Sequence, residues 1–75
     1  MQLSWHNLTH MWNAARARQL LDKHGRTRRW LADQCGIAEK SLGNMLRGRA
    51  PGRPVLKLMA KALETTEDYL AGKSD

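Results

Sequence analysis

The chain of 75 residues has no phenylalanine, a single cysteine and no long apolar run. One cysteine, Cys35, excludes an internal disulfide framework and suits a reducing cytoplasm. No stretch approaches the roughly 18 apolar residues that a membrane span needs. The N-terminus also lacks the basic region followed by an apolar run that is typical of a secretory signal. We therefore expect a cytoplasmic protein that does not enter membranes.

The length is sufficient for one domain, close to the lower size at which a chain folds alone. Because Phe is absent, Leu, Met, Ala and Trp must build the core. A core of this size gives only a few kcal/mol of net stability, and dimerisation is a common supplement.

The positive charge is concentrated in the middle of the chain. The net charge is +2 over residues 1–25, +7 over residues 26–61 and −3 over residues 62–75. A basic segment of this kind attracts polyanions such as nucleic acid. The alternative is an ordinary basic surface, and the helical pattern of the same segment favours nucleic acid.

Apolar spacings of three and four predict five helices and no strand, over about 9–24, 28–34, 38 or 39–48, 54–63 and 67–70. Gly25 is placed to end the first helix, and Thr27 and Thr66 to cap the second and the last. Pro54 fits the first turn of the fourth helix. The residues expected on buried faces are Ala14, Ala17, Leu20, Leu21, His24, Leu31, Leu42, Met45, Leu46, Val55, Leu58, Met59, Ala62, Leu63, Tyr69 and Leu70.

The second and third predicted helices are separated by a short turn. Gly36 lies where the chain turns sharply, and we expect a positive φ there. Ile37 would fill the angle between the helices, Leu42 would anchor the third, and Cys35 would be buried by the turn. Two helices at this spacing are the usual means by which a small protein presents one helix to the DNA major groove.

With Gly36-Ile37, Leu42 and the Thr66–Leu70 segment in place, the chain resembles the lambda-repressor-like (Cro/XRE) helix-turn-helix family. The resemblance covers residues 13–70, leaving 1–12 as an N-terminal extension and 71–75 as a tail. It implies an all-α, five-helix DNA-binding domain and a transcriptional regulator of phage or bacterial origin, Cro-like and repressing. It also implies a homodimer on a two-fold operator. Since the sequence starts at Met1 and ends soon after the fifth helix, we expect no separate ligand-binding domain.

The third predicted helix has an outward polar face that suits base reading. Asn44 would contact adenine through both atoms of its amide, and Lys40 would donate to guanine or to a phosphate. Glu39 would accept from cytosine N4 or hold a basic neighbour, and Ser41 would touch a base or a phosphate. The alternative is a solvated face with no ligand. Gly43, in mid-helix, would leave room for the DNA backbone or a thymine methyl.

Phosphate contacts are expected from basic side chains around this helix and from the cap of the second helix. Arg28 occupies the position where the family usually places a phosphate-binding Gln. The expected phosphate-binding residues are Thr27, Arg28, Arg47, Arg49 and Arg53.

Nothing in the sequence indicates an enzyme, a cofactor or a small-molecule substrate. His6 and His10 have i,i+4 spacing but lack further ligands, so no metal site is expected. A protein-interaction module, such as an antitoxin, is the alternative function. It is supported by the apolar side chains of Trp5, Leu8 and Trp12, although packing on the domain is the simpler role for Trp5 and Trp12. Trp30 is expected to cover a crevice beside the first helix.

Overall fold

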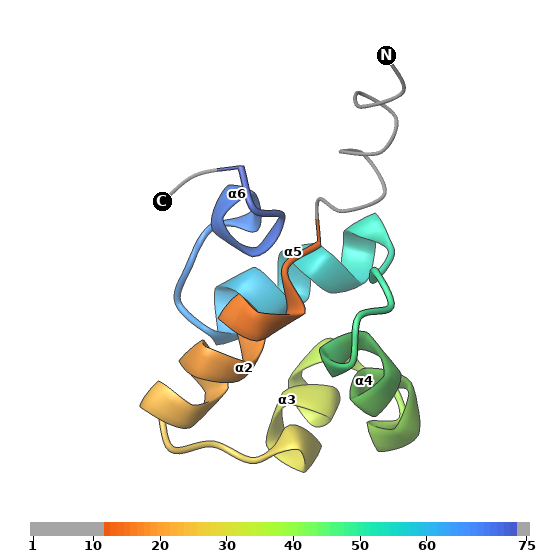
Figure 1. The fold of residues 1–75 in the computed structure, drawn as a ribbon. Coiled ribbons are helices and arrows are strands. Elements are labelled where there is room, and N and C mark those ends of the chain that lie inside the picture. The colour runs from red at the N-terminus through yellow and green to blue at the C-terminus, as the bar shows by residue number, and fades with distance from the viewer. Residues whose placement is uncertain (1–11, 74–75) are drawn as a thin grey trace.

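The computed structural model describes residues 12–73, and every regular element in this range is a helix (Figure 1). The elements are α2 (Ala14–Lys23), α3 (Arg28–Cys35), α4 (Glu39–Leu46), α5 (Arg53–Ala62) and α6 (Glu67–Leu70). The predicted all-α class and the order of the helices are thus confirmed. In Figure 1, α3 and α4 lie next to each other at one end of the molecule, with α6 at the other.

Helix α2 begins later than the sequence indicated. The sequence predicted a helix from Thr9, which lies outside the described residues. Residues 12 and 13 are described and are not helical, so the prediction is wrong at these two positions. The Asn13 side chain accepts a hydrogen bond from the main-chain N–H of Arg16 and caps the helix. The main-chain N–H of Asn13 donates to the Leu70 carbonyl at 2.8 Å. Both bonds hold the chain outside the helical conformation at this point.

The other helix ends follow the predicted turn and cap chemistry with one exception. Thr27 and Thr66 accept hydrogen bonds from the main-chain N–H groups of Trp30 and Tyr69, and Pro54 lies in the first turn of α5. Helix α4, however, ends at Leu46 and not at Gly48. Gly48 has a φ of 131°, which a right-handed helix does not allow.

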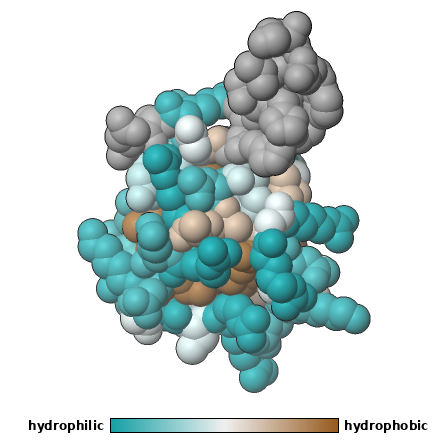
Figure 2. Space-filling model, in the orientation of Figure 1, coloured by the Kyte–Doolittle hydropathy of each residue, from teal (hydrophilic) through white to brown (hydrophobic). Residues whose placement is uncertain are grey.

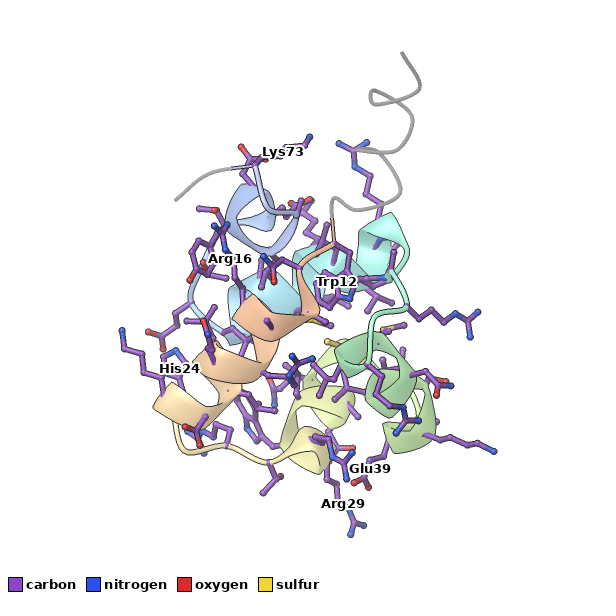
Figure 3. All side chains as sticks on the ribbon, viewed as in Figure 1. Trp12, Arg16, His24, Arg29, Glu39 and Lys73 are labelled. Carbon is purple, nitrogen blue, oxygen red and sulfur yellow. The ribbon has the colours of Figure 1, made fainter. Side chains whose placement is uncertain are left out.

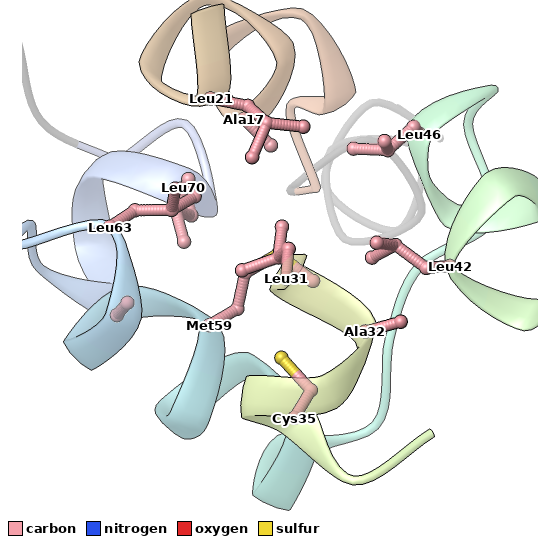
Figure 4. Packing of buried hydrophobic residues seen from close by; sticks show 11 residues of the cluster. Ala17, Leu21, Leu31, Ala32, Cys35, Leu42, Leu46, Met59, Leu63 and Leu70 are labelled. Atoms are coloured by element: carbon pink, nitrogen blue, oxygen red, sulfur yellow. The ribbon is translucent and has the colours of Figure 1, made fainter. Parts of the chain in front are cut away.

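The core lies between the helices, where α3 packs on α4 and α5 and α2 packs on α4 and α6. Figure 4 shows Leu31 and Met59 at its centre. The buried apolar residues are Ala17, Leu21, Leu31, Ala32, Cys35, Leu42, Leu46, Met59, Ala60, Leu63 and Leu70.

Most of the predicted core is confirmed, with two departures. Leu58 is 44% exposed, so its assignment to the buried face of α5 was wrong. Helix α5 packs mainly on α3 and α6, and Leu58 is not among the residues that lie against the core. His24 is exposed although its Nε2 lies 3.0 Å from the Leu63 carbonyl oxygen. The half-buried residues that pack against the core include Leu20, Met45 and Val55.

Candidate nucleic-acid interface

The turn between α3 and α4 fixes the angle at which α4 leaves the domain. Gly36 adopts the left-handed conformation, with φ 67° and ψ 31°, as predicted. The main-chain N–H of Ile37 donates to the Ala32 carbonyl at 3.0 Å, which closes the end of α3. Ile37 is half-buried against the core, and Leu42 is fully buried. The two helices therefore meet in a fixed arrangement typical of a helix-turn-helix.

Helix α4 buries one face and presents the other. Leu42, Gly43 and Leu46 are buried, whereas Glu39 and Lys40 are exposed. Figure 3 shows Glu39 projecting from the end of the molecule formed by α3 and α4, and Figure 2 shows mainly hydrophilic side chains along that edge. The exposed face of α4 is therefore free to enter a groove about as wide as a helix.

Two predicted base-reading residues share one hollow with two predicted phosphate-binding residues. Glu39, Lys40, Arg28, Gly43 and Arg47 line a hollow of about 340 Å³, which we call the reading hollow. Carboxylate, ammonium and guanidinium groups thus meet over the exposed face of α4. This set combines hydrogen-bond acceptors and donors with positive charge, as recognition of bases between phosphates requires.

Asn44 is held by its neighbour on the next turn. Arg47 donates from Nη2 to Asn44 Oδ1 at 2.8 Å. Because a guanidinium has no acceptor, the amide oxygen must face Arg47, and this sets the orientation of the whole amide. The Asn44 amide nitrogen then points away from Arg47 with both of its hydrogens. The i,i+3 spacing of the two residues is the sequence signal for this contact.

The space above Gly43 is flanked by arginines. A Cβ atom at Gly43 would lie 3.8 Å from Arg28 Nη1 and 4.0 Å from Arg47 Nη2. The room provided by the glycine is therefore bordered by two guanidinium groups that come from different helices. Arg28 reaches α4 from the first residue of α3, the position at which the sequence indicated a phosphate contact.

The remaining predicted site residues lie outside the reading hollow. Ser41 is half-buried on α4. Thr27 is exposed, and its hydroxyl oxygen accepts from the Trp30 N–H at 3.0 Å, which leaves the hydroxyl hydrogen free to donate. Arg49 is exposed in the loop after α4, where its main-chain N–H donates to the Asn44 carbonyl at 3.1 Å. Arg53 lines a different hollow, between the start of α5 and α6.

Two residues that the sequence did not assign to the site support the end of α4. Trp12 donates from Nε1 to the Met45 carbonyl at 2.8 Å. Arg18 donates from Nη1 to the Leu46 carbonyl. The last carbonyls of a helix have no partner within it, so both bonds act as caps. Their partners lie 33 and 28 residues away, and no local pattern in the sequence indicates them.

Cys35 is buried beside the turn, as predicted, and burial raises the pKa of its thiol. A thiol with a raised pKa holds its proton and is a weak nucleophile.

The described residues contain neither a metal cluster nor a membrane span. Residues 12–73 include no group of three or more His, Cys, Asp or Glu side chains that could hold a metal ion. His6 and His10 lie outside this range. Within it, no helix is both long and apolar enough to cross a bilayer.

A family model described as Helix-turn-helix matches residues 18–70. No match was found among curated proteins or among solved structures. The matched range starts within α2, includes α3, the Gly36 turn and α4, and ends at the last residue of α6. It agrees with the resemblance predicted from the sequence. The chain therefore belongs to the Cro/C1-type helix-turn-helix family of DNA-binding regulatory domains.

Proposed function

We propose that the protein is a sequence-specific transcriptional regulator that places α4 in the major groove of double-stranded DNA. The observation that carries this proposal is the reading hollow, which Glu39 and Lys40 line together with Arg28 and Arg47. The carboxylate and ammonium groups suit contacts to base edges, and the guanidinium groups suit phosphates.

Each side chain has a distinct proposed role. Asn44 contacts adenine, Lys40 donates to guanine or a phosphate, and Glu39 accepts from cytosine N4. Ser41, half-buried at the side of α4, makes a secondary contact to a base or phosphate. The proposed phosphate-binding residues are Thr27, Arg28, Arg47, Arg49 and Arg53.

Arg53 lies apart from the other proposed phosphate contacts that line the reading hollow. It borders a hollow with Trp12 and Glu67, and it shares no hollow with Arg28 or Arg47. A phosphate contact there requires the DNA backbone to reach the start of α5. We expect its loss to weaken binding less than the loss of Arg47.

We further propose a homodimer on a two-fold operator, acting as a repressor in the cytoplasm, where it associates with the nucleoid. A helix as short as α4 spans only part of one half-site, and a dimer of helix-turn-helix domains contacts two. Two copies of α4 would then lie in successive major grooves about one helical turn apart. Phage or bacterial origin is an expectation from the family.

Selection of bound DNA from a random pool, followed by a salt titration on the recovered sequence, tests this function. We expect a two-fold motif and an affinity that falls steeply as salt rises. Recovery of no preferred sequence, together with binding that is indifferent to salt, would show that DNA is not the ligand.

The alternative function is a protein-interaction module or an antitoxin, and one of the residues that favoured it, Trp12, has another role in the structure. Trp12 was part of the apolar surface predicted for a partner, but it is half-buried and bonded to α4. Trp5 and Leu8 lie outside the described residues.

A further inference from the structure

A second hollow adjoins the reading hollow on the side of α2. Its volume is about 330 Å³, and it shares Arg28, Gly43 and Arg47 with the reading hollow. Arg28 and Arg47 therefore lie on the boundary between the two hollows. We call this second space the α2 hollow. In the proposed function, the backbone of a DNA strand whose bases contact α4 would run beside this boundary.

The α2 hollow is strongly basic at its rim. Arg18 and Arg26 join Arg28 and Arg47 there, and Asp22 is its one acidic residue. Four guanidinium groups against one carboxylate give a local charge of about +3 at neutral pH. Guanidinium groups present paired donors that match the oxygens of a phosphate.

The lining of the α2 hollow is apolar beneath this rim. Leu21 and Leu46 line it and are only 7% and 4% exposed. A simple inorganic anion gains nothing from an apolar surface. A sugar–phosphate segment does, because the deoxyribose presents carbon atoms while the phosphate remains at the charged rim.

Three of the four arginines of the α2 hollow are held in place by other contacts. Arg18 donates to the Leu46 carbonyl, and Arg47 donates to Asn44. The Arg26 guanidinium lies over the Trp30 ring, 4.8 Å from its centre. A cation–π contact does not neutralise the guanidinium charge, which stays available to attract an anion.

We infer that the α2 hollow binds a phosphate and sugar of the DNA backbone next to the bases read by α4, with Arg26 as an additional phosphate contact. This inference rests on the proposed function, and it adds Arg26 and the apolar floor of the α2 hollow to the phosphate contacts already proposed for Arg28 and Arg47. The contact positions the domain without reading sequence.

The test compares Arg26→Gln with Lys61→Gln on the selected operator by fluorescence anisotropy over a range of salt concentrations. Lys61 is exposed in the last turn of α5 and lines no hollow described above, so this variant removes the same charge elsewhere. For Arg26→Gln we expect weaker binding to all sequences, and a slope of log affinity against log salt that is smaller by about 0.9. Lys61→Gln should change the slope much less.

A second measurement locates the contact on the DNA. Single phosphates of the operator are replaced by neutral methylphosphonates, and each duplex is titrated with the wild-type protein, Arg26→Gln and Arg26→Lys. We expect one position at which the replacement weakens the wild type and Arg26→Lys severalfold but weakens Arg26→Gln clearly less, because only Arg18, Arg28 and Arg47 then remain around that phosphate. This comparison remains decisive if Arg26→Gln is less stable, because Arg26→Lys keeps the charge.

The outcomes separate the inference from the proposed function. If the wild type shows neither sequence preference nor salt dependence, the proposed function itself is wrong. If the wild type binds its operator but Arg26→Gln matches Lys61→Gln, and every methylphosphonate affects all proteins alike, only the α2 hollow is wrongly assigned.

Discussion

The indole nitrogen of Trp12 donates a 2.8 Å hydrogen bond to the Met45 carbonyl, at the end of the helix that carries the proposed base-reading residues. Arg18 bonds the next carbonyl, that of Leu46. The segment before α2 and α2 itself thus hold the C-terminal end of α4. Trp12 also precedes residue 18, where the family match starts, so this support comes from outside the matched range.

Trp12→Phe should destabilise the domain and loosen the end of α4. The change keeps most of the ring packing but removes the N–H, and loss of one such hydrogen bond costs about 1 kcal/mol. Urea denaturation followed by circular dichroism measures this cost. The matched control is Trp30→Phe, since Trp30 is also half-buried but its indole forms no hydrogen bond in the described structure. Trp30→Phe serves as a control for stability alone, because its ring contacts Arg26. Operator affinity of Trp12→Phe equal to that of the wild type would exclude a positioning role for Trp12.

Asn44→Ala should relax base preference at one position of each half-site, at a cost of about 1–3 kcal/mol for the preferred base. The side chain is held over the face of α4 by Arg47, so its loss removes a contact with defined orientation. Binding to operators with each of the four bases at that position provides the measurement. If Asn44→Ala keeps the wild-type base preference at every position, the Asn44 side chain does not contribute to base recognition.

Arg47→Ala should reduce both affinity and specificity, and Arg49→Ala should reduce affinity alone. Arg47 orients the Asn44 amide, whereas Arg49 lies exposed in the loop and contacts α4 only through its main chain. We expect Arg47→Ala to relax the same base position as Asn44→Ala. The double variant should then lose less than the sum of the two single losses. Additive losses would mean that Arg47 binds phosphate independently of Asn44.

Gly43→Ala should stabilise the domain by about 1 kcal/mol, because glycine is unfavourable inside a helix. The added Cβ atom would meet Arg28 and Arg47 at 3.8 and 4.0 Å, which are ordinary contact distances. Thermal unfolding measures the gain. If the arginine side chains, and not DNA, occupy the space beside Gly43, the operator affinity of Gly43→Ala should differ little from that of the wild type. Gly43→Leu should displace the arginines and weaken binding. Strong weakening by alanine would show instead that DNA atoms occupy the space.

Because of Cys35, the free energy of unfolding should decrease at alkaline pH. Burial raises the pKa of the thiol in the folded state above that in the unfolded chain, which is about 8.5. The resulting stability is fully present below the unfolded pKa and is lost as the pH rises through the folded pKa. Above about pH 8.5, the unfolding free energy of the wild type should fall more steeply than that of Cys35→Ala.

Urea denaturation under reducing conditions at several pH values compares the two proteins. All other ionisable groups are common to the two proteins, so the difference between the curves isolates the thiol. Cys35→Ala should be less stable at pH 7 by about 1 kcal/mol, owing to lost packing. Parallel curves would show that the thiol is not desolvated.

The local features of the fold followed from the sequence, because local chemistry determines them. Thr27 and Thr66 cap helices, and Gly36 has the positive φ that the turn requires. The start of α2 was missed because Asn13 bonds to Leu70, which lies at the other end of the chain. Leu58 was wrongly predicted to be buried, because the spacing of apolar residues does not show how much of a helix face is covered by neighbouring helices.

In the candidate site, too, features set by local sequence were predicted and contacts between separate helices were not. The exposed positions of Glu39 and Lys40 follow from helical spacing around the buried Leu42. By contrast, the meeting of Arg28 with Gly43, and of Trp12 and Arg18 with the end of α4, depends on the packing of separate helices. Spacing within one helix carries no information on such contacts.

Helix α4 has eight residues, a length of roughly 12 Å, and no side-chain cap at its start. Isolated helices of this length do not persist in water. Its shape is supplied by Leu42 and Leu46 on one side and by Trp12 and Arg18 at its end. The side chains of Glu39, Lys40 and Asn44 belong neither to the buried core nor to these bonds at the end of α4. If base reading falls to them as proposed, exchanging these three side chains in place should change the target preference, whereas a synthetic α4 peptide should retain none of it.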